Sequence, residues 1–298
     1  MTYKQLGKSD LQVSEIAFGC MSLGSDHAAN ARLLHRAVEQ GINFFDTADL
    51  YDKGANEETV GKAFAGMREQ VIIATKVGNQ WRADGSGWDW NPTKSYILQA
   101  VDESLKRLQT DYIDLYQLHG GTIDDPIDDT IEAFELLKKQ GKIRHYGISS
   151  IRPNVIREYV SRSGIASVML QYSLLDRRPE ESVLDLLQEQ GIGVLARGSL
   201  AQGLLAGKPA KPYLGYTLEE VQKAADAVQA VAGTGRKSAE VAVRYTLYHP
   251  AVSAAVLGIR TEEQLDDALR ISKSVSLTAE EIKALQQTLR ANRYEQHR

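Results

Sequence analysis

Four side chains suited to acid–base chemistry stand at or just beyond the ends of short apolar runs. They are Asp46, Tyr51, Lys76 and His119. A phenol has a pKa of about 10 and exchanges protons poorly at neutral pH, unless a nearby ammonium stabilises the phenolate. A carboxylate keeps that ammonium charged, and an imidazole can orient a carbonyl oxygen and share its developing charge. The four groups therefore suit the reduction of a carbonyl, for which a cofactor must donate the hydride.

The apolar runs that must position these groups recur along the chain, and helical sequence follows each one. They are Ile16–Gly19, Ile42–Asp46, Val71–Thr75, Ile113–Leu118, Ile143–Ile148, Ser167–Gln171, Gly193–Ala196 and Val252–Leu257. Strands that alternate with helices imply a parallel sheet, and eight units in 298 residues favour a closed barrel. No Gly-x-Gly-x-x-Gly follows the first strand, which disfavours an open dinucleotide-binding sheet. We therefore predict an α/β fold, a (β/α)8 TIM barrel, as a single domain over residues 1–298.

The predicted barrel carries additions at both ends of the chain. Residues 3–13 alternate around a Gly7–Asp10 turn, which predicts a β-hairpin that plugs the barrel floor. Near the C-terminus, Thr261 and Thr278 each precede Gln or Glu by three residues, which predicts a capping box at the start of two extra helices.

In such barrels the C-terminal ends of the strands form the active face. The four acid–base groups are thus predicted to meet at one mouth, with Ser149, Ser150, Gln171, Arg197 and Gly258 at the ends of later strands. Each group alone has an ordinary structural explanation, such as turn capping for an aspartate or core packing for a histidine. Their shared position is what predicts an active site.

Composition narrows the function class. The net charge is −4, without a basic block, which disfavours a nucleic-acid partner. Cys20 is the only cysteine and excludes an internal disulfide, as expected in a reducing cytosol. No apolar run approaches the roughly 20 residues of a membrane span. We expect a cytoplasmic protein, and a monomer or weak homo-oligomer.

Four motifs around the predicted site occur as a set. They are Gly41-Ile42-Asn43-Phe44-Phe45-Asp46-Thr47-Ala48-x-x-Tyr51, Ile72-Ile73-Ala74-Thr75-Lys76, Asp114-Leu115-Tyr116-Gln117-Leu118-His119 and Gly141-Lys142-Ile143-Arg144-x-x-Gly147-Ile148-Ser149. The set resembles the signatures of the aldo-keto reductase superfamily, in particular bacterial members of the group that also contains potassium-channel β-subunits. The resemblance extends from the N-terminal hairpin to the eighth strand.

The resemblance implies roles for matching residues. Tyr51 would be the general acid in reduction, Lys76 paired with Asp46 would lower its pKa, and His119 would orient the carbonyl of an aldehyde or ketone. The implied cofactor is NADPH/NADP+, bound extended across the barrel mouth, with Ser149 and Gln171 holding the nicotinamide carboxamide.

Two departures affect the expected nicotinamide site. Ser150 stands where the family commonly has Asn, and a hydroxyl offers fewer donors than an amide. Within Arg197-Gly198-Ser199-Leu200, Arg197 stands where many members carry an aromatic residue. A guanidinium can stack on a ring but repels the oxidised nicotinamide, so we hypothesise a bias toward the reduced cofactor. Alternatively, Arg197 turns toward phosphate or solvent.

A second group of predicted cofactor residues follows the eighth strand. Gly258-Ile259-Arg260 opens a helix whose N-terminus would attract anions, and we assign Arg260 and Gln264 to a 2′-phosphate. Ala268 replaces the Asn that often contacts adenine in the family. The assignment of Arg260 and Gln264 to a 2′-phosphate nevertheless favours NADPH over NADH.

The three tryptophans lie in one loop after Lys76. They are Trp81, Trp88 and Trp90. Long loops rich in aromatics are often functional, so we predict a wall of the substrate pocket with hinges at Gly85 and Gly87. The alternative is a surface loop that packs its own aromatics.

Two other functions remain to be weighed against reduction. Lys76 could be the nucleophile of a Schiff-base aldolase, although no second lysine lies nearby. The chain could instead be a cofactor-binding regulatory or redox-sensing subunit with slow turnover. No His-x-His or His-Glu-x-x-His pair supports a metal site, and the acidic run Asp124–Asp129 stands at a predicted helix start.

Overall fold

Eight parallel strands close into a barrel in the computed structural model, which describes residues 1–298. Around the barrel the strands follow the order β10, β11, β12, β3, β4, β5, β8, β9. Their bounds are β3 Ile16–Gly19, β4 Phe44–Asp46, β5 Ile72–Val77, β8 Ile113–Leu118, β9 Ile143–Ser149, β10 Ser167–Gln171, β11 Gly193–Arg197 and β12 Val252–Gly258. The predicted (β/α)8 barrel is confirmed.

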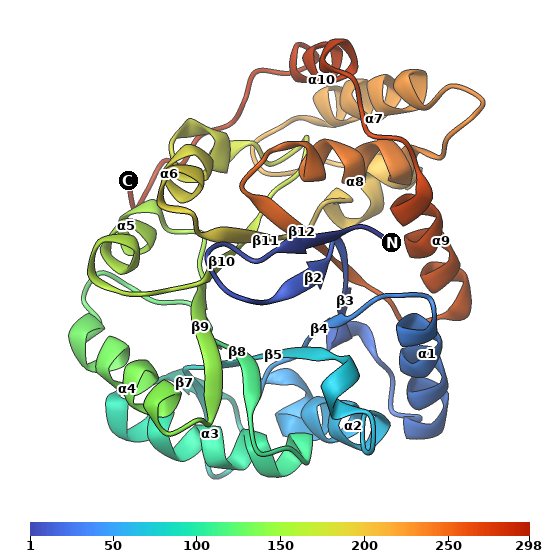
Figure 1. Cartoon of the computed structure of the whole chain (residues 1–298). Coiled ribbons are helices and arrows are strands. Elements are labelled where there is room, and N and C mark those ends of the chain that lie inside the picture. The colour runs from blue at the N-terminus through green and yellow to red at the C-terminus, as the bar shows by residue number, and fades with distance from the viewer.

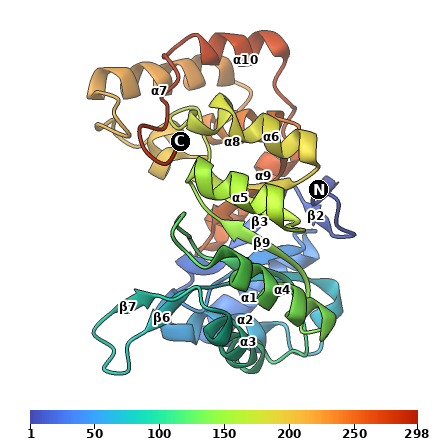
Figure 2. The same ribbon diagram turned by 90° about the vertical axis from the view of Figure 1, so that its left-hand side faces the viewer.

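Helices surround the strands, and two further helices lie outside this ring (Figure 1). The ring contains α1 His27–Glu39, α2 Ala55–Ala63, α3 Lys94–Leu108, α4 Ile127–Lys139, α5 Pro153–Arg162, α6 Val183–Gln190, α8 Ser238–Tyr248 and α9 Glu262–Lys273. The outer pair, α7 Leu218–Ala232 and α10 Ala279–Gln286, packs together at one end of the molecule, as the side view shows (Figure 2). No helix is long and apolar enough to cross a membrane.

The two C-terminal helices begin differently from each other. At α10, Thr278 and Glu281 form the predicted capping box. At α9, Thr261 Oγ1 accepts from the Gln264 N–H at 3.2 Å, but Gln264 Oε1 accepts from the Arg260 N–H at 2.9 Å. The predicted second capping box is therefore only half formed, because the Gln264 amide reaches one residue further back.

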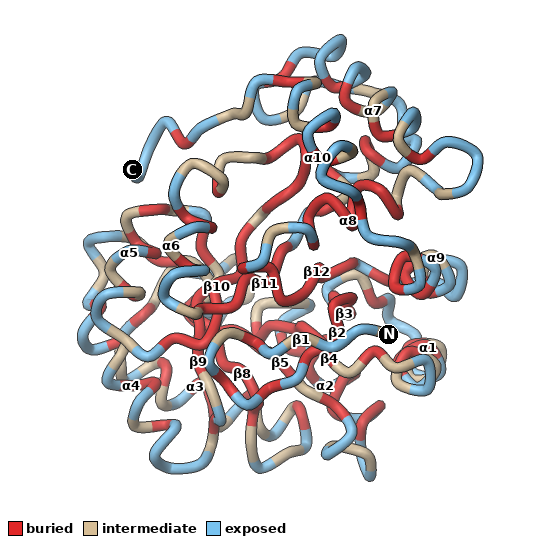
Figure 3. The backbone as a smooth tube through the Cα atoms, turned by 45° about the horizontal axis from the view of Figure 1, so that its top comes forward, coloured by how far each residue is buried: buried red, intermediate tan, exposed pale blue.

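The N-terminal hairpin closes the barrel floor. Strands β1 Tyr3–Gln5 and β2 Gln12–Ser14 pair antiparallel, and Leu6, Leu11 and Val13 pack against residues that fill the barrel interior. A larger apolar core lies between the strands and the helices. Buried residues are therefore concentrated along the barrel strands, and exposed residues lie mainly on the outer helices (Figure 3). Full burial of Leu6 predicts a loss of about 2–5 kcal/mol on truncation to Ala.

Alternation along the strands decides which side chains reach the barrel axis. On β4, Phe44 belongs to the interior core and Phe45 to the outer core, which returns Asp46 to the axis. On β5, Ala74 lies in the interior core and pairs with Asp46, so Lys76 also faces inward. The same alternation on β8, where Leu115 faces inward, directs Gln117 to the axis.

The loop that contains Trp81, Trp88 and Trp90 forms an antiparallel hairpin. Strands β6 Asn79–Trp81 and β7 Trp88–Trp90 pair with Trp81 opposite Trp88, and Arg82–Gly87 forms the tip. The hairpin projects away from the barrel (Figure 2).

Candidate active site

A cavity of about 700 Å³ opens at the C-terminal mouth of the barrel. Every barrel strand contributes a residue from its end or from the position just beyond. These residues are Gly19, Asp46, Lys76, His119, Ser149, Gln171, Arg197 and Gly258. The four predicted acid–base residues are among the lining, since Tyr51 contributes from the turn after β4. The structure thus brings the tetrad together in a space large enough for a small ligand.

A buried ion pair lies at the base of this cavity. The Lys76 ammonium donates to Asp46 Oδ2 and to the Thr47 carbonyl, each at 2.7 Å. Gln117 Nε2 lies 3.4 Å from the other carboxylate oxygen. Lys76 is only 1% exposed and Asp46 4%, so the charges are held by these partners instead of water.

Burial and pairing act together on these two groups. Burial opposes the charge of Lys76, but the Asp46 carboxylate and the Tyr51 phenol outweigh it and raise the pKa of Lys76 above its ordinary value. Burial also raises the pKa of Asp46, against the opposing effect of the ammonium. Lys76 is therefore a lasting positive charge beside the phenol.

The Tyr51 hydroxyl accepts a hydrogen bond from the Lys76 ammonium at 3.2 Å. The ammonium also lies 4.8 Å from the centre of the phenol ring. Burial raises the pKa of Tyr51, and Lys76 lowers it by a smaller amount. Lys76 thus acts on the pKa of Tyr51 in the expected direction, but burial outweighs it, because the depth of the phenol is a property of the tertiary structure. Tyr51 therefore keeps its proton at neutral pH.

The His119 imidazole faces the edge of the same phenol. The ring centres are 5.9 Å apart and nearly perpendicular, with an angle of 84°. Burial, assisted by the positive charges of Lys76 and Arg197, lowers the pKa of His119 to about 3. Its Nδ1 atom is buried without a partner in the chain. A neutral imidazole and a protonated phenol thus flank one position where a carbonyl oxygen can be bound.

Comparison with known proteins agrees with this geometry. Residues 15–290 match the family model described as Aldo/keto reductase family. The chain belongs to the aldo/keto reductase family. The family uses NAD(P)H, and the protein is accordingly an NAD(P)H-dependent oxidoreductase.

Several relatives of this reductase are similar over most of their length. The uncharacterized oxidoreductase YqkF of Bacillus subtilis is 51% identical, with 100% of each chain covered. The holo-form structure of the aldo-keto reductase AKR11C1 from Bacillus halodurans is 51% identical with a TM-score of 0.94, covering 100% of this chain and 99% of that one. The fission-yeast aldo-keto reductase yakc [NADP(+)] is 35% identical over 67% of this chain and 62% of its own.

Most residues predicted for the cofactor line the cavity of about 700 Å³ at the barrel mouth, which we call the reaction cavity. They are Ser149, Ser150, Gln171, Arg197, Gly198 and Gly258. Gln171 is held from two sides, because its Nε2 donates to Tyr213 Oη at 3.1 Å and its Oε1 accepts from Arg197 at 3.0 Å. The hydroxyl of Ser150 accepts from the Arg152 N–H at 3.2 Å, so this short side chain stabilises its own loop.

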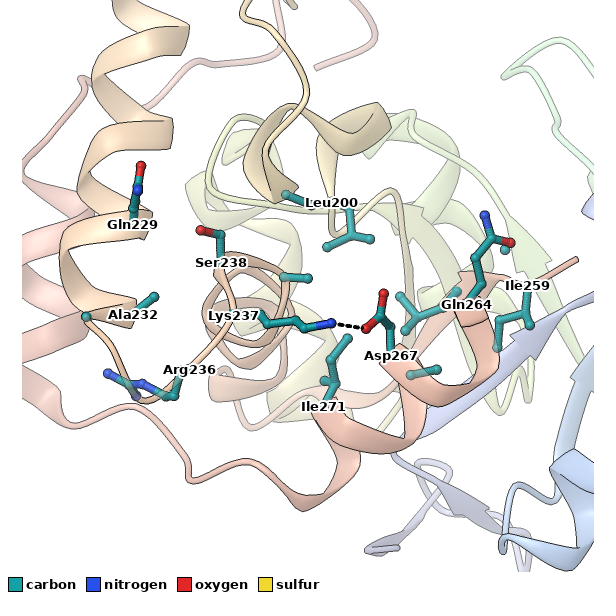
Figure 4. Close-up of a pocket in the computed structure, with 16 residues that line it drawn as sticks. Leu200, Gln229, Ala232, Arg236, Lys237, Ser238, Ile259, Gln264, Asp267 and Ile271 are labelled. Carbon is teal, nitrogen blue, oxygen red and sulfur yellow. Dashed lines mark hydrogen bonds and ion pairs between the residues drawn. The ribbon is translucent and has the colours of Figure 1, made fainter. Parts of the chain in front are cut away.

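A second cavity of about 520 Å³ lies beside the first and shares Gly258 with it. Predicted residues Leu200 and Gln264 line it, and Lys237 and Asp267 form an ion pair of 2.6 Å across it (Figure 4). Arg260 lines neither cavity. The two cavities form an elongated site across the barrel mouth.

Sequence reasoning missed part of this second cavity. Arg236 and Lys237 line it from the turn between α7 and α8, and Ser238 lines it from the first position of α8. Two adjacent basic residues before a predicted helix were the available signal. Their proximity to Asp267 on α9 depends on helix packing, which no local pattern reports.

None of the tryptophans lines the reaction cavity, contrary to the expected pocket wall. Trp88 is 47% exposed on the hairpin, and Trp81 lines a separate cavity with Lys53 lying over its ring. Trp90 donates to Asp125 at 2.9 Å and packs close to Gly120. Trp90 therefore packs behind Gly120, which itself lines the reaction cavity.

Proposed function

We propose that this reductase uses NADPH to reduce aldehydes or ketones to alcohols, with Tyr51 as the proton donor. The observation that carries the proposal is the buried chain of contacts from Asp46 through Lys76 to the Tyr51 hydroxyl, at 2.7 and 3.2 Å. A phenol that is protonated at rest suits donation to a carbonyl oxygen.

Each group of the tetrad then has a task in the reduction. His119 is neutral and donates a hydrogen bond to the carbonyl oxygen, which orients the substrate. Tyr51 transfers its proton to that oxygen as negative charge develops there. Lys76 stabilises the phenolate that remains, and Asp46 with the Thr47 carbonyl keeps the ammonium in place.

The elongated site suits a two-ended dinucleotide. Gly258 lies between the two cavities, and a Cβ there would come within 2.7 Å of Ser22 Oγ, so a side chain would narrow the passage. Gln171 and Ser149 would hold the carboxamide in the first cavity. When bound, the nicotinamide supplies the hydride that the side chains lack.

A basic second cavity supports a preference for NADPH. Arg236 and Lys237 would meet the 2′-phosphate there, together with Gln264. Arg260 stays assigned to the same phosphate on the strength of its position before α9. We expect a higher kcat/KM with NADPH than with NADH. Lys237→Met should reduce this preference, whereas Lys223→Met, on the exposed face of α7, should leave it unchanged. Equal use of both cofactors would contradict the preference.

The reaction itself is tested by following the hydride. With NADPH carrying deuterium at the transferable position and a panel of aldehydes and ketones, we expect alcohols with one deuterium on the former carbonyl carbon. Cofactor binding without turnover of any panel member would contradict the proposal and would favour a cofactor-sensing role.

A further inference from the structure

Two arginines add unpaired positive charge to the reaction cavity. Beyond the Asp46–Lys76 pair and the neutral His119, its only charged lining residues are Arg152 and Arg197. Neither forms an ion pair with any residue of the chain. A cavity with uncompensated positive charge attracts anionic ligands and disfavours cationic ones.

The two arginines come from the ends of different strands and have different hydrogen-bond partners. Arg197, at the end of β11, donates to Gln171, which belongs to the proposed nicotinamide contacts. Arg152 follows β9, and its guanidinium donates to the Gly121 carbonyl beyond β8. Gly121 is two residues from His119, so their Cα atoms are at most about 7 Å apart. Arg152 is therefore anchored to the segment that begins at His119, and both residues line the reaction cavity.

Most of the Arg152 guanidinium is free to bind a ligand. A guanidinium has five N–H donors, and this one makes a single hydrogen bond within the chain, to Gly121. The anchored nitrogen fixes the orientation of the planar group, whose remaining donors match the paired oxygens of a carboxylate or phosphate.

A neighbouring cavity extends outward from Arg152. Ile151 and Arg152 line both the reaction cavity and a neighbouring cavity of about 680 Å³ under the C-terminal segment. Arg290 and the acidic Glu295 line this neighbour without ionic partners, and Glu220 there accepts from the Thr217 N–H at 2.8 Å. Arg152 thus stands at the junction between the carbonyl site and an approach route for an extended substrate.

We propose that the substrates of this reductase are carbonyl compounds that carry an anionic group, a carboxylate or phosphate, bound by Arg152 at a short distance from the carbonyl. The inference rests on the proposed carbonyl reduction and adds the class of substrate. A charge-assisted contact of this kind favours the anion by on the order of tenfold or more.

The test compares substrates that differ in charge but little in reactivity. 4-Carboxybenzaldehyde is compared with its neutral methyl ester, and glyceraldehyde 3-phosphate with glyceraldehyde, at low ionic strength. We expect kcat/KM to be about tenfold or more higher for the anion in at least one pair, mainly through a lower KM. The pair with the larger ratio identifies the preferred anion.

Variants connect the preference to Arg152. Arg152→Gln should reduce the anion-to-neutral ratio to near one, and Arg152→Lys should keep part of it because the charge remains. Arg157→Gln removes an exposed arginine from helix α5, which begins just after Arg152, and should leave the ratio unchanged. Equal reduction of both members of both pairs by the wild type would overturn this inference alone, as would equal loss of preference in the Arg152→Gln and Arg157→Gln variants. Reduction of no carbonyl compound at all would overturn the proposed function itself.

Discussion

The two sides of the barrel mouth differ in how their side chains are held. On the side of β4, β5 and β8, Asp46 and Lys76 are buried and bonded to each other and to the backbone. On the side of β9 to β11, Gln171 is partly buried and Arg197 is exposed, with bonds mainly between these side chains. The first side holds groups for proton transfer in fixed positions. The second keeps donors accessible for ligands, as a binding surface requires.

The largest effect should follow the loss of a charge from the buried side. Lys76→Met leaves the Asp46 carboxylate buried without a counter-ion, which costs about 3–5 kcal/mol of the free energy of unfolding. Urea denaturation measures the loss. Lys62→Met removes an exposed lysine, paired with Glu58 at 3.6 Å, and should cost under about 1 kcal/mol. Adding Asp46→Asn to Lys76→Met should recover stability; a further loss would contradict the buried pair.

A smaller effect is expected when the pair loses only its negative member. Asp46→Asn keeps the shape of the side chain but removes the charge that raises the pKa of Lys76. We expect kcat/KM to fall by about tenfold or more, with NADPH affinity retained. Asp102→Asn, at a partly exposed pair with Lys142, is the matched control. Equal kcat/KM in the two variants would show that the ion pair does not act on Tyr51.

The pH profile separates the two titratable groups that flank the carbonyl. The lowered pKa of His119, about 3, keeps the imidazole neutral above that pH, and the raised pKa of Tyr51 keeps the phenol protonated until alkaline pH. We therefore expect kcat/KM for reduction to lack a step near the ordinary histidine pKa of about 6.5, and to decline only at alkaline pH. A step near neutral pH that disappears in His119→Asn would contradict this assignment.

The smallest effect is expected at the hairpin, which belongs to neither side. Trp88 is exposed and outside the reaction cavity, so Trp88→Ala should change kcat/KM by less than about twofold. Trp90→Phe removes the hydrogen bond to Asp125 and should lower stability by about 1–3 kcal/mol. A large change in KM for Trp88→Ala would support the sequence-based prediction that the tryptophans form a wall of the substrate pocket.

The sequence predicted the side of β4, β5 and β8 better than the rest of the site. All eight predicted apolar runs form barrel strands, and alternation along β4 and β5 accounts for the inward positions of Asp46 and Lys76. The orientation of the tryptophans was not predictable, because it depends on strand pairing and on the distant Asp125. The lowering effect of Lys76 on the pKa of Tyr51 was predicted, but the larger effect of burial was not, since burial is set by the assembled barrel.

The division between the two sides is tested most directly by Tyr51→Phe, compared with Gln171→Ala. The single-turnover rate of NADPH oxidation at saturating cofactor is measured alongside the cofactor Kd. We predict that Tyr51→Phe slows the rate by about 10²–10⁴-fold while the cofactor Kd stays near the wild-type value. Gln171→Ala should mainly raise the cofactor Kd. A Tyr51→Phe enzyme that keeps most of its single-turnover rate would contradict the account.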